Sequence, residues 1–506
     1  MDGLVQKFQP GDQAGYHAGE RPADTDEKAT HPFFRPGKNC WRYEHASRMA
    51  PLVDGEAFFS AARAAMRRAE KRIAILAWDF DSATWLRPHR RGRWRLAIGE
   101  FLHDLVESRP ELEIYILVWW GSVFYGANRD FPISFGTEWW SHPRIHFRLD
   151  DHHPVGASHH QKIVSIDDKI AFSGGMDLTQ GRWDSVRHTP DNRHRQEQDA
   201  PYDPVHDVQV LYDGDAARAI ARLVAERWRF VTGESLAPVT TRSNPWPLRV
   251  LPKFRDIQIA IARSQPAFGE QPEVREIEAL NMDMLRSAKQ LIYIEQQYYT
   301  IPAVNDILCE HLERPDGPEV VIVMNDISSG WIEQQAMFGN RDRLFELLYR
   351  ADKFARLRTF TPVCSREPLI KIKVHAKLMI VDDLYLRIGS SNLNHRSLGL
   401  DTECDIAITG ETTAMCDAIR TFRHRLLAEH LGTRTRRVAR FARRYRSTVR
   451  AIDALNVKQR HLHLYPRLGL DGEIEMAPAS ALIDPPRTID FKYLWEWLLS
   501  NFRPRR

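Results

Sequence analysis

The chain has few cysteines, no long apolar run and no apolar leader. Its five cysteines show no C-x-x-C spacing, which argues against a disulfide framework or a cysteine zinc site. The longest apolar stretch, Ile114 to Ala127, is shorter than the roughly 20 residues of a membrane-spanning helix. Met1 to Thr30 is polar, unlike a signal peptide. We therefore expect a cytoplasmic or peripheral membrane protein, with signal-independent secretion left open.

Net charge is also low. The formal value of +4 is too small to indicate nucleic acid as a partner. Positive charge is concentrated in one segment, Thr433 to Arg450, which holds eight arginines and no acidic residue. In a helix, the apolar residues of this segment would form a stripe flanked by arginines. Such a helix suits an anionic lipid surface, a polyanion or packing on the rest of the protein, and all three interpretations stay open.

Helix-like and strand-like segments alternate along the sequence. With 506 residues, of which 43% are hydrophobic, the chain is large enough for two sizeable cores. The alternation favours sheets covered by helices. The expected helices are 54–70, 94–108, 215–230, 273–288 and 412–430, and the expected strands are 72–80, 113–120, 290–296, 319–325 and 385–388.

An eight-residue pattern, H-x-K-x4-D, occurs twice. Its defining residues are His160, Lys162, Asp167, His375, Lys377 and Asp382. A pair of small residues follows each copy at the same offset, Gly174-Gly175 after the first and Gly389-Ser390 after the second. A single copy would be weak evidence, because three fixed positions recur by chance. Two copies in register indicate a duplicated unit.

Each copy places its histidine and lysine on one side of a strand. His160 and Lys162 are two residues apart, as are His375 and Lys377, and alternate side chains of a strand face the same way. Histidine titrates near neutral pH, so one imidazole can be a nucleophile while another delivers a proton. Lysine supplies positive charge for phosphate oxygens. Two such copies brought together suit in-line displacement at a phosphodiester through a phosphohistidine, without a metal or other cofactor.

A metal site at the first copy is the alternative interpretation. Six candidate ligands crowd the sequence there: Asp150, Asp151, His152, His153, His159 and His160. Histidine is the commonest metal ligand. The second copy has no such neighbours, and no H-E-x-x-H motif occurs in the chain. We therefore expect no catalytic metal, while a loosely bound ion at the loop stays open.

The duplicated pattern resembles the signature of the phospholipase D superfamily. Segments 174–184 (GGMDL and GRWD), 292–298 (IYIEQQY) and 389–403 (GSSNLN, RS and DTE) are similar to segments of eukaryote-type members. The similarity covers about residues 40 to 430, with the order of motifs preserved. Val205 stands where the family usually has tryptophan, and Gln296 where it usually has asparagine. These departures concern contacts to substrate and leave both signature histidines in place.

The resemblance implies an α/β fold of two pseudo-symmetric repeats. Each repeat would be a mostly buried mixed sheet flanked by helices, with the active site in the cleft between them. We expect a loose N-terminal arm at 1–39, a first repeat at 40–237, a linker at 238–255, a second repeat at 256–431 and a basic C-terminal extension at 432–506.

The resemblance also implies roles for the signature residues. His160 would be the nucleophile, and His375 would be the general acid and then the base. Lys162, Lys377 and Asn392 would contact phosphate oxygens.

Five acidic residues complete the expected site. Asp177 occupies the place in the first repeat that the phosphate-contacting asparagine has in the second. Glu403 is expected to hold the second ring nitrogen of the second-repeat histidine, and Asp184 that of the first-repeat histidine, because a carboxylate there fixes the tautomer. Asp167 and Asp382 would support the strand ends and carry no protons.

We therefore expect a phospholipase D that acts at a phospholipid membrane surface. It would cleave the distal phosphodiester of glycerophospholipids to phosphatidic acid and a free headgroup, with transfer to alcohols as a second outcome. The alternatives are a cardiolipin synthase-type phosphatidyltransferase, a nucleic-acid phosphodiesterase and a non-catalytic membrane-binding protein. The eukaryote-type segments disfavour the first two, and the intact His-Lys pairs disfavour the third. The sequence does not fix the headgroup, the acceptor or the oligomeric state.

Overall fold

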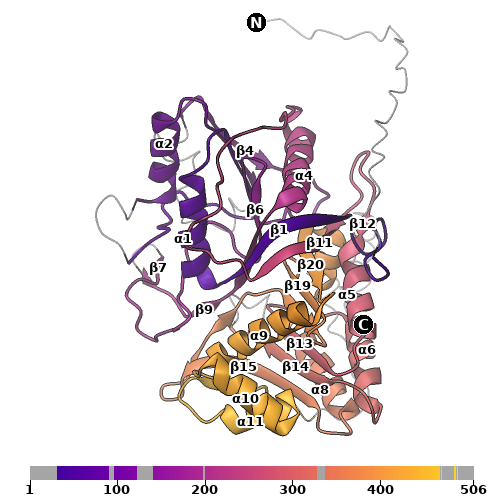
Figure 1. Ribbon diagram of the computed structural model, residues 1–506. Coiled ribbons are helices and arrows are strands. Elements are labelled where there is room, and N and C mark those ends of the chain that lie inside the picture. The colour runs from indigo at the N-terminus through magenta and orange to yellow at the C-terminus, as the bar shows by residue number, and fades with distance from the viewer. Residues whose placement is uncertain are drawn as a thin grey trace, which may run out of the picture.

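Two halves of the chain meet along a pair of long strands. The computed structural model describes residues 31–89, 96–121, 141–197, 200–327 and 337–467, together with 469, 484, 485 and 487. The earlier half, indigo to magenta, lies above the later half, orange to yellow, in Figure 1. Strands β1 (Arg42–Val53) and β11 (Phe254–Gln265) pair antiparallel where the halves meet. They join the halves into one 17-stranded sheet.

The first half contributes strands in the order β4–β3–β2–β5–β6–β10–β1. Within it, β2, β3 and β4 are parallel, and the remaining neighbours are antiparallel. The bounds are β2 Arg72–Ala77, β3 Glu113–Trp119, β4 Ile145–Asp150, β5 Ile163–Ile166, β6 Ile170–Gly174 and β10 Val208–Asp213.

The second half repeats this arrangement as β15–β14–β13–β18–β19–β20–β11. Again three strands, β13, β14 and β15, are parallel and the rest antiparallel. The bounds are β13 Leu291–Gln296, β14 Glu319–Met324, β15 Leu357–Ser365, β18 Leu378–Val381, β19 Tyr385–Gly389 and β20 Glu403–Thr409. The sheet therefore has pseudo-twofold symmetry about the line between β1 and β11.

Short strands add to the edges and connections. They are β7 Gln196–Glu197, β8 Ala200–Pro201, β9 Val205–His206, β12 Val274–Arg275, β16 Ile370–Lys371, β17 Lys373–Val374 and β21 His461–Leu464. The helical segments are α1 Asp54–Met66, α2 Ile98–Ser108, α4 Gly214–Thr232, α5 Glu276–Arg286, α6 Pro302–Glu313, α8 Gly339–Ala351, the π-helical η4 Arg396–Leu400, α9 Thr413–His430, α10 Thr435–Tyr445 and α11 Thr448–Leu455. Among the described residues, none of these helices is long and apolar enough to cross a membrane.

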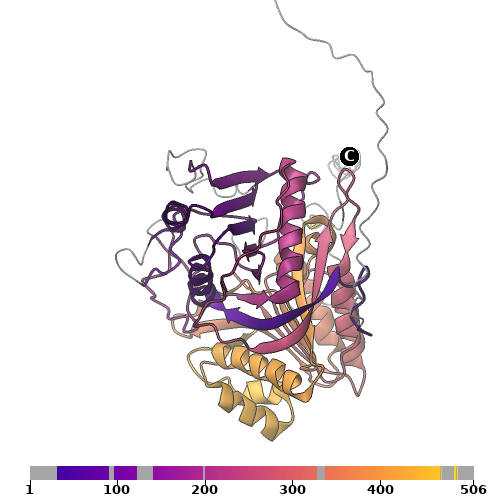
Figure 2. The ribbon, with the colours of Figure 1, turned by 45° about the horizontal axis from the view of Figure 1, so that its top comes forward.

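Alternate residues of each strand enter different cores. Ile73 and Ile75 pack in a cluster with α1 and α2, whereas Leu76 packs on the opposite face with α4 and α9. The second half has its own cluster with α5, α6 and α8, to which β13 contributes Ile292. The cluster under α4 and α9 contains strand residues of both halves, and Figure 2 shows α4 rising from this shared face. A shared core of this kind resists separation of the halves, because separation would expose apolar surface of both.

The fold class predicted from the sequence is confirmed. Each predicted helix and strand is present, with boundaries that shift by a few residues. The expected helix at 94–108 is described from residue 96 on and begins at Ile98. The long strand β11 begins at Phe254, inside the segment expected to be a linker. Charged side chains along β11 and β1 obscure the apolar alternation that would have revealed these strands.

The N-terminal arm was expected to be loose over 1–39, and this is wrong for its last residues. Phe34 is buried against the second half, and Phe33 stacks on Tyr385 of β19. Asn39 is also buried, with its amide donating to Asp283 in α5. Residues 1–30 lie outside the described part of the chain.

The two signature aspartates anchor neighbouring strands. Asp167 accepts hydrogen bonds from the backbone N–H groups of Glu70, Lys71 and Arg72 at the start of β2, at 2.8–2.9 Å. Asp382 accepts three equivalent bonds at the start of β13. Both aspartates occupy left-handed turns between the strands of a hairpin, with φ of 52° and 55°. Their position gives them a structural role and leaves no contact with either signature histidine.

Replacing Asp167 with Asn tests this anchoring. Asparagine tolerates the left-handed backbone, but its NH2 group faces an N–H donor and the charge is lost. We expect Asp167→Asn to lower the free energy of unfolding by about 1–3 kcal/mol, measured by urea denaturation. The exposed Asp316, paired only with Arg314 on the surface, is the matched control, and Asp316→Asn should have little effect. Equal losses in both variants would contradict the anchoring role.

Candidate active site

The first-repeat histidine lies where its strand segment pairs with the second half. His159 forms a parallel bridge with Thr402, and the backbone N–H of His160 donates to the carbonyl of Thr402 at 3.0 Å. This pairing places the next residue of the second half, Glu403, beside the imidazole. His160 Nδ1 lies 2.8 Å from Glu403 Oε1.

The second-repeat histidine has the same arrangement with the halves exchanged. In β17, Val374 pairs in parallel with His206 of β9, and the N–H of His375 donates to the carbonyl of His206 at 2.8 Å. The next residue of the first half, Asp207, then reaches the ring. His375 Nδ1 lies 2.7 Å from Asp207 Oδ2.

Each histidine therefore takes its carboxylate from the opposite half. The prediction that Glu403 would hold His375 is wrong, because strand pairing across the two halves carries Glu403 to His160 instead. In both pairs Nδ1 faces the carboxylate, so Nε2 is the nitrogen left for chemistry. The His160 side chain is 16% exposed and that of His375 5%, so the first-repeat ring is the more accessible.

The prediction that Asp184 would hold the ring of His160 is also wrong, because Asp184 does not contact His160. Its oxygens accept from His188 Nδ1 at 2.9 Å, from Arg195 and from the backbone N–H of Val205. These contacts hold the loop that leads into β9. Asp184 therefore supports the segment of the first half that carries Asp207, the carboxylate partner of His375.

The small-residue turns make room for the carboxylates. A Cβ on Gly175 would lie 2.2 Å from Asp207 Oδ1, and one on Gly389 would lie 1.8 Å from Asp405 Oδ1. Neither contact is sterically allowed, so both positions require glycine. Gly175 thus lets the neighbouring strand bring Asp207 close to His375, whereas Gly389 makes room for Asp405, which pairs with Arg387.

The lysines differ in their partners. Lys162 Nζ lies 3.2 Å from Asp177 Oδ2, whereas Lys377 Nζ donates to Gln297 Oε1 at 2.9 Å. Asp177 is thus a counter-ion for Lys162, a role that its pseudo-symmetric equivalent Asn392 cannot fill. In the part of the chain that the structure describes, Asn392 Oδ1 is buried without a hydrogen-bond partner.

Burial and crowded positive charge keep the two imidazoles neutral. Burial lowers the pKa of His160 well below its ordinary value, and the charges of Lys162 and Lys377 lower it further. Burial and Lys377 likewise lower the pKa of His375, with smaller contributions from Arg182 and Lys162. Each lysine thus acts on the histidine of the other half, which means that the two His-Lys pairs converge. A bound anion would supply the missing negative charge.

Burial shifts the pKa values of Lys377 and Asp207 toward neutral pH from opposite sides. Burial lowers the pKa of Lys377 to about 7 and raises that of Asp207 to about 7. Both shifts favour the uncharged form of a buried group. An anion such as a phosphodiester would favour the charged form of Lys377.

Sequence reasoning missed Asp207, Arg182 and Gln297. Asp207 lies two residues before Gln209, which pairs with Gly174, just as Glu403 lies two residues before the strand partner of the equivalent glycine. The loop between β6 and β10 is much longer than the one between β19 and β20, so the sequence does not show this equivalence. Aligning the strands that follow each glycine pair would have found it.

The loop considered for a metal has other partners. Asp150 accepts from Arg227 at 2.7 and 2.8 Å, and His159 Nδ1 lies 3.3 Å from the same carboxylate. Trp119 donates to His153 Nε2 at 2.8 Å. These side chains bind one another and brace the segment that leads to the first-repeat histidine.

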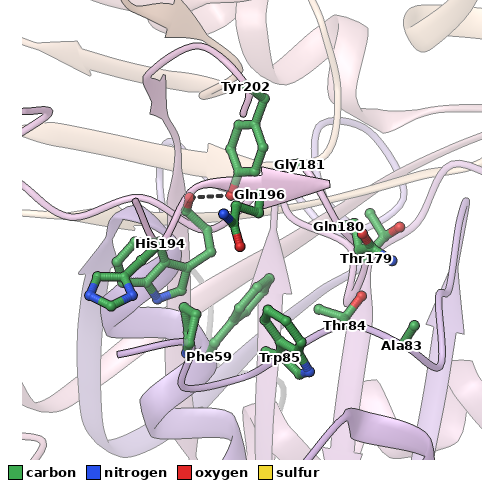
Figure 3. A pocket seen from close by; sticks show the side chains of 12 residues that line it. Phe59, Ala83, Thr84, Trp85, Thr179, Gln180, Gly181, His194, Gln196 and Tyr202 are labelled. Atoms are coloured by element: carbon green, nitrogen blue, oxygen red, sulfur yellow. Dashed lines mark hydrogen bonds between the residues drawn. The ribbon is translucent and has the colours of Figure 1, made fainter. Parts of the chain in front are cut away.

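A cavity of about 220 Å³ lies on the first half (Figure 3). Aromatic rings line it, including Phe59, Trp85 and Tyr202, whose hydroxyl donates to the carbonyl of Trp183. None of the signature residues lines it.

Exchange of the carboxylates can be tested by imidazole ¹⁵N NMR. Glu403→Gln should disturb the Nδ1–H tautomer of His160 alone, because only that ring loses its acceptor, while Asp207→Asn should disturb His375 alone. His160→Ala and His375→Ala assign the two signals. Disturbance of the His375 signal by Glu403→Gln would contradict the observed pairing.

Several known proteins are similar to this chain in sequence or in fold. A family model described as Phospholipase D matches residues 336–461. The chain is 23% identical to phospholipase D1 of Saccharomyces cerevisiae over 75% of this chain and 28% of that protein, and 23% identical to phospholipase D2 of Bos taurus over 72% and 49%. It thus spans half or less of the length of these relatives. A phosphatidylserine synthase of Haemophilus influenzae has the same fold, with a TM-score of 0.54 and 14% identity over 79% of this chain and 95% of that chain. The family-model match and these relatives support the phospholipase D superfamily, and the chain resembles its eukaryote-type members.

Proposed function

We propose that the protein is a phosphodiesterase that cleaves the distal phosphodiester of glycerophospholipids, giving phosphatidic acid and a free headgroup. The observation that supports this most directly is the convergence of two neutral imidazoles, each held at Nδ1 by a buried carboxylate and each with a buried lysine beside it. The curated relatives named phospholipase D point to the same class of substrate.

In the first step, His160 Nε2 attacks phosphorus and the bond from phosphorus to the headgroup oxygen breaks. His375 gives a proton to that oxygen, which leaves as an alcohol. Lys162 and Lys377 stabilise the charge on the phosphate oxygens, together with Asn392. The anion itself raises the proton affinity of His375, because it offsets the charge of the lysines.

In the second step, His375 removes a proton from water as the water oxygen attacks phosphorus. The bond between phosphorus and His160 then breaks, and phosphatidic acid leaves. A primary alcohol in place of water gives a new phosphodiester through the same intermediate. The side chains of both steps supply nucleophile, acid, base and charge, so the mechanism runs without a bound metal.

Product analysis tests the proposal. Purified protein mixed with phosphatidylcholine and phosphatidylethanolamine in EDTA should release headgroup and phosphatidic acid, and added ethanol should give phosphatidylethanol, detected by mass spectrometry. His160→Ala should reduce the rate by about ten-thousand-fold or more, because the nucleophile is lost. Activity that EDTA removes and only a divalent ion restores would contradict this mechanism.

The arginine-rich segment supports an approach to anionic membranes. In helix α10, Val438 is buried and Phe441 packs against the core, so the apolar stripe faces the protein. The arginines of the segment are exposed, and among the described residues none of them forms an ion pair. They are Arg434, Arg436, Arg437, Arg440, Arg443, Arg444, Arg446 and Arg450. Figure 1 shows α10 on the outside of the second half. Such a surface adheres by charge and does not insert into the bilayer.

Vesicle binding tests this surface. Changing four arginines of α10 to Gln should weaken binding to vesicles containing phosphatidylserine by up to about 1 kcal/mol per charge, less at high salt. Turnover of a soluble short-chain phospholipid should stay normal. The four are Arg436, Arg437, Arg440 and Arg444. Changing exposed arginines of α4, which are Arg218, Arg222 and Arg229, is the control and should have less effect per charge. Equal effects per charge would contradict a specific role of α10.

A further inference from the structure

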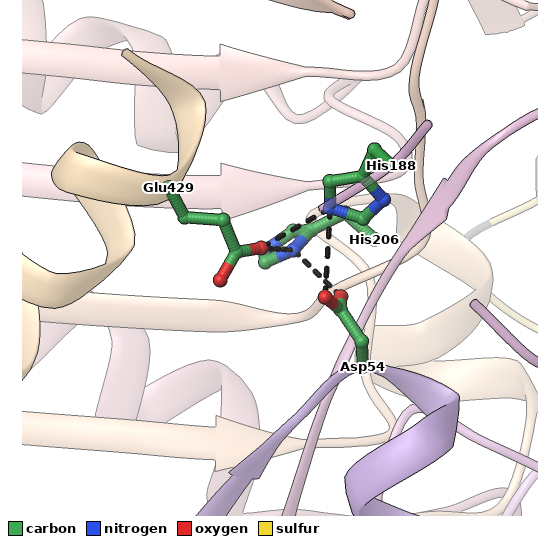
Figure 4. A group of neighbouring side chains, drawn as sticks. All are labelled: Asp54, His188, His206 and Glu429. Carbon is green, nitrogen blue, oxygen red and sulfur yellow. Dashed lines mark hydrogen bonds and ion pairs between the residues drawn. The ribbon is translucent and has the colours of Figure 1, made fainter. Parts of the chain in front are cut away.

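A buried cluster of histidines and carboxylates lies beside the second-repeat histidine (Figure 4). Asp54 at the start of α1, His188, His206 of β9 and Glu429 of α9 have interacting atoms within 4.8 Å of one another. All four are buried. Asp54, His188 and His206 belong to the first half and Glu429 to the second, so the cluster spans the junction. The mechanism above uses none of them.

The contacts of His206 require protons on both ring nitrogens. Its Nδ1 lies 3.0 Å from Asp54 Oδ1 and 3.0 Å from Glu429 Oε1, and its Nε2 lies 2.9 Å from Glu295 Oε2. A neutral imidazole has one N–H, and its other nitrogen would direct a lone pair at a carboxylate oxygen. With the three carboxylates ionised and no metal ion among them, an imidazolium satisfies all three contacts.

His188 meets the same condition. Its Nδ1 lies 2.9 Å from Asp184 Oδ2, and its Nε2 lies 3.2 Å from Glu429 Oε1 and 3.5 Å from Asp54 Oδ2. His430 differs, because only its Nε2 has a partner, Glu295, and a neutral ring suffices. The cluster therefore contains two buried imidazolium groups.

These charges balance. Four carboxylates, Asp54, Asp184, Glu295 and Glu429, face two imidazolium groups, Arg195 bound to Asp184, and Arg460, whose charge acts on Glu429 and Asp54. Burial alone would lower the pKa of a histidine, but the surrounding carboxylates raise that of His188 to about 9 and that of His206 well above its ordinary value. A buried charge that is fully paired is costly to disturb, since removing one member leaves the others uncompensated.

The cluster is joined through the backbone to the second-repeat pair. The carbonyl of His206 accepts the N–H of His375 at 2.8 Å, and the next residue along the chain is Asp207. Asp54 donates its N–H to the carbonyl of Asp207 at 2.8 Å. Both partners of the acid-base pair are thus fixed to residues of the cluster.

The pseudo-symmetric position in the other half lacks this anchor. Thr402 stands where His206 stands, directly before the carboxylate, and its carbonyl accepts the N–H of His160. Its hydroxyl lies 3.1 Å from His159 Nδ1 and makes no ion pair. Of the two residues that directly precede the exchanged carboxylates, His206 is therefore the one that joins an ion cluster.

We propose that His206 is a positioning residue for proton transfer by His375, held as an imidazolium by carboxylates of α1, β13 and α9. This inference rests on the proposed function. The position of His206 fixes where the backbone places His375 and Asp207. It therefore fixes the direction in which Nε2 of His375 delivers its proton. The role is specific to steps in which the leaving group needs that proton.

A divalent metal is the alternative occupant. It would replace the protons on His188 Nε2 and His206 Nδ1 and be bound by Asp54 and Glu429 as well. An arginine at position 206 keeps a positive charge and offers several N–H donors to the carboxylates, but it does not serve as a metal ligand. His206→Arg should therefore keep the activity if the cluster holds protons and lose it if the cluster holds a metal ion.

Two substrates separate positioning from general loss of structure. A choline ester needs a proton on its leaving group, whereas a p-nitrophenyl phosphodiester does not. We expect His206→Gln to slow release of choline by about 10- to 100-fold and to leave the first burst of nitrophenol nearly unchanged. His206→Arg should restore most of the choline rate. The control is His311→Gln, because His311 is also buried but its ring bonds to the backbone carbonyl of Leu285 and to no carboxylate among the described residues, so the activity of this variant should be normal.

Equal loss on both substrates in a folded His206→Gln protein would overturn the positioning role. So would a failure of His206→Arg together with about one metal ion per chain in the purified protein, measured by plasma mass spectrometry. Inactive wild-type protein would instead overturn the proposed function. If His206→Gln does not fold, ¹⁵N NMR of the wild type at pH 8 decides: two imidazolium signals support the assignment, and neutral rings at His188 and His206 overturn it.

Discussion

The exchange of carboxylates between the two halves is the interaction on which the site depends. Glu403 of the second half holds His160, and Asp207 of the first half holds His375. Neither half orients its own histidine. Both a fixed tautomer and a defined ring direction therefore require the halves to be joined, so that separation of the halves would remove the chemistry even if each half remained folded.

The continuous sheet and its shared core hold the two halves together and so maintain this exchange. The junction of β1 and β11 continues one sheet through both halves, and the apolar cluster under α4 and α9 draws residues from each. Pseudo-twofold symmetry then produces two equivalent crossings, one for each histidine. The crossings are not chemically equal, because His206 and its ion cluster precede Asp207 while a threonine precedes Glu403. The difference parallels the different tasks proposed for the two histidines, one as nucleophile and the other in proton transfer.

The sequence predicted the fold class and the convergence of the His-Lys pairs, because duplication and period-two spacing are visible in one dimension. It placed Asp167 and Asp382 correctly as supports of strands. It failed where the answer depended on pairing between distant strands. Glu403 was expected at the wrong histidine, and Asp207 was overlooked, since nothing local shows which ring a buried carboxylate will face. The packed residues Phe34 and Asn39 were missed for the same reason: their partners lie far away in the sequence.

In the proposed mechanism, one composite site transfers the phosphatidyl group through His160. Peptide mapping of the wild-type protein, quenched at neutral to alkaline pH within milliseconds of mixing with phospholipid, tests it most directly. We expect a phosphatidyl adduct on His160 Nε2, in the peptide that contains Lys162, and none on His375. An adduct on His375, or complete headgroup release with no adduct at any time, would contradict it.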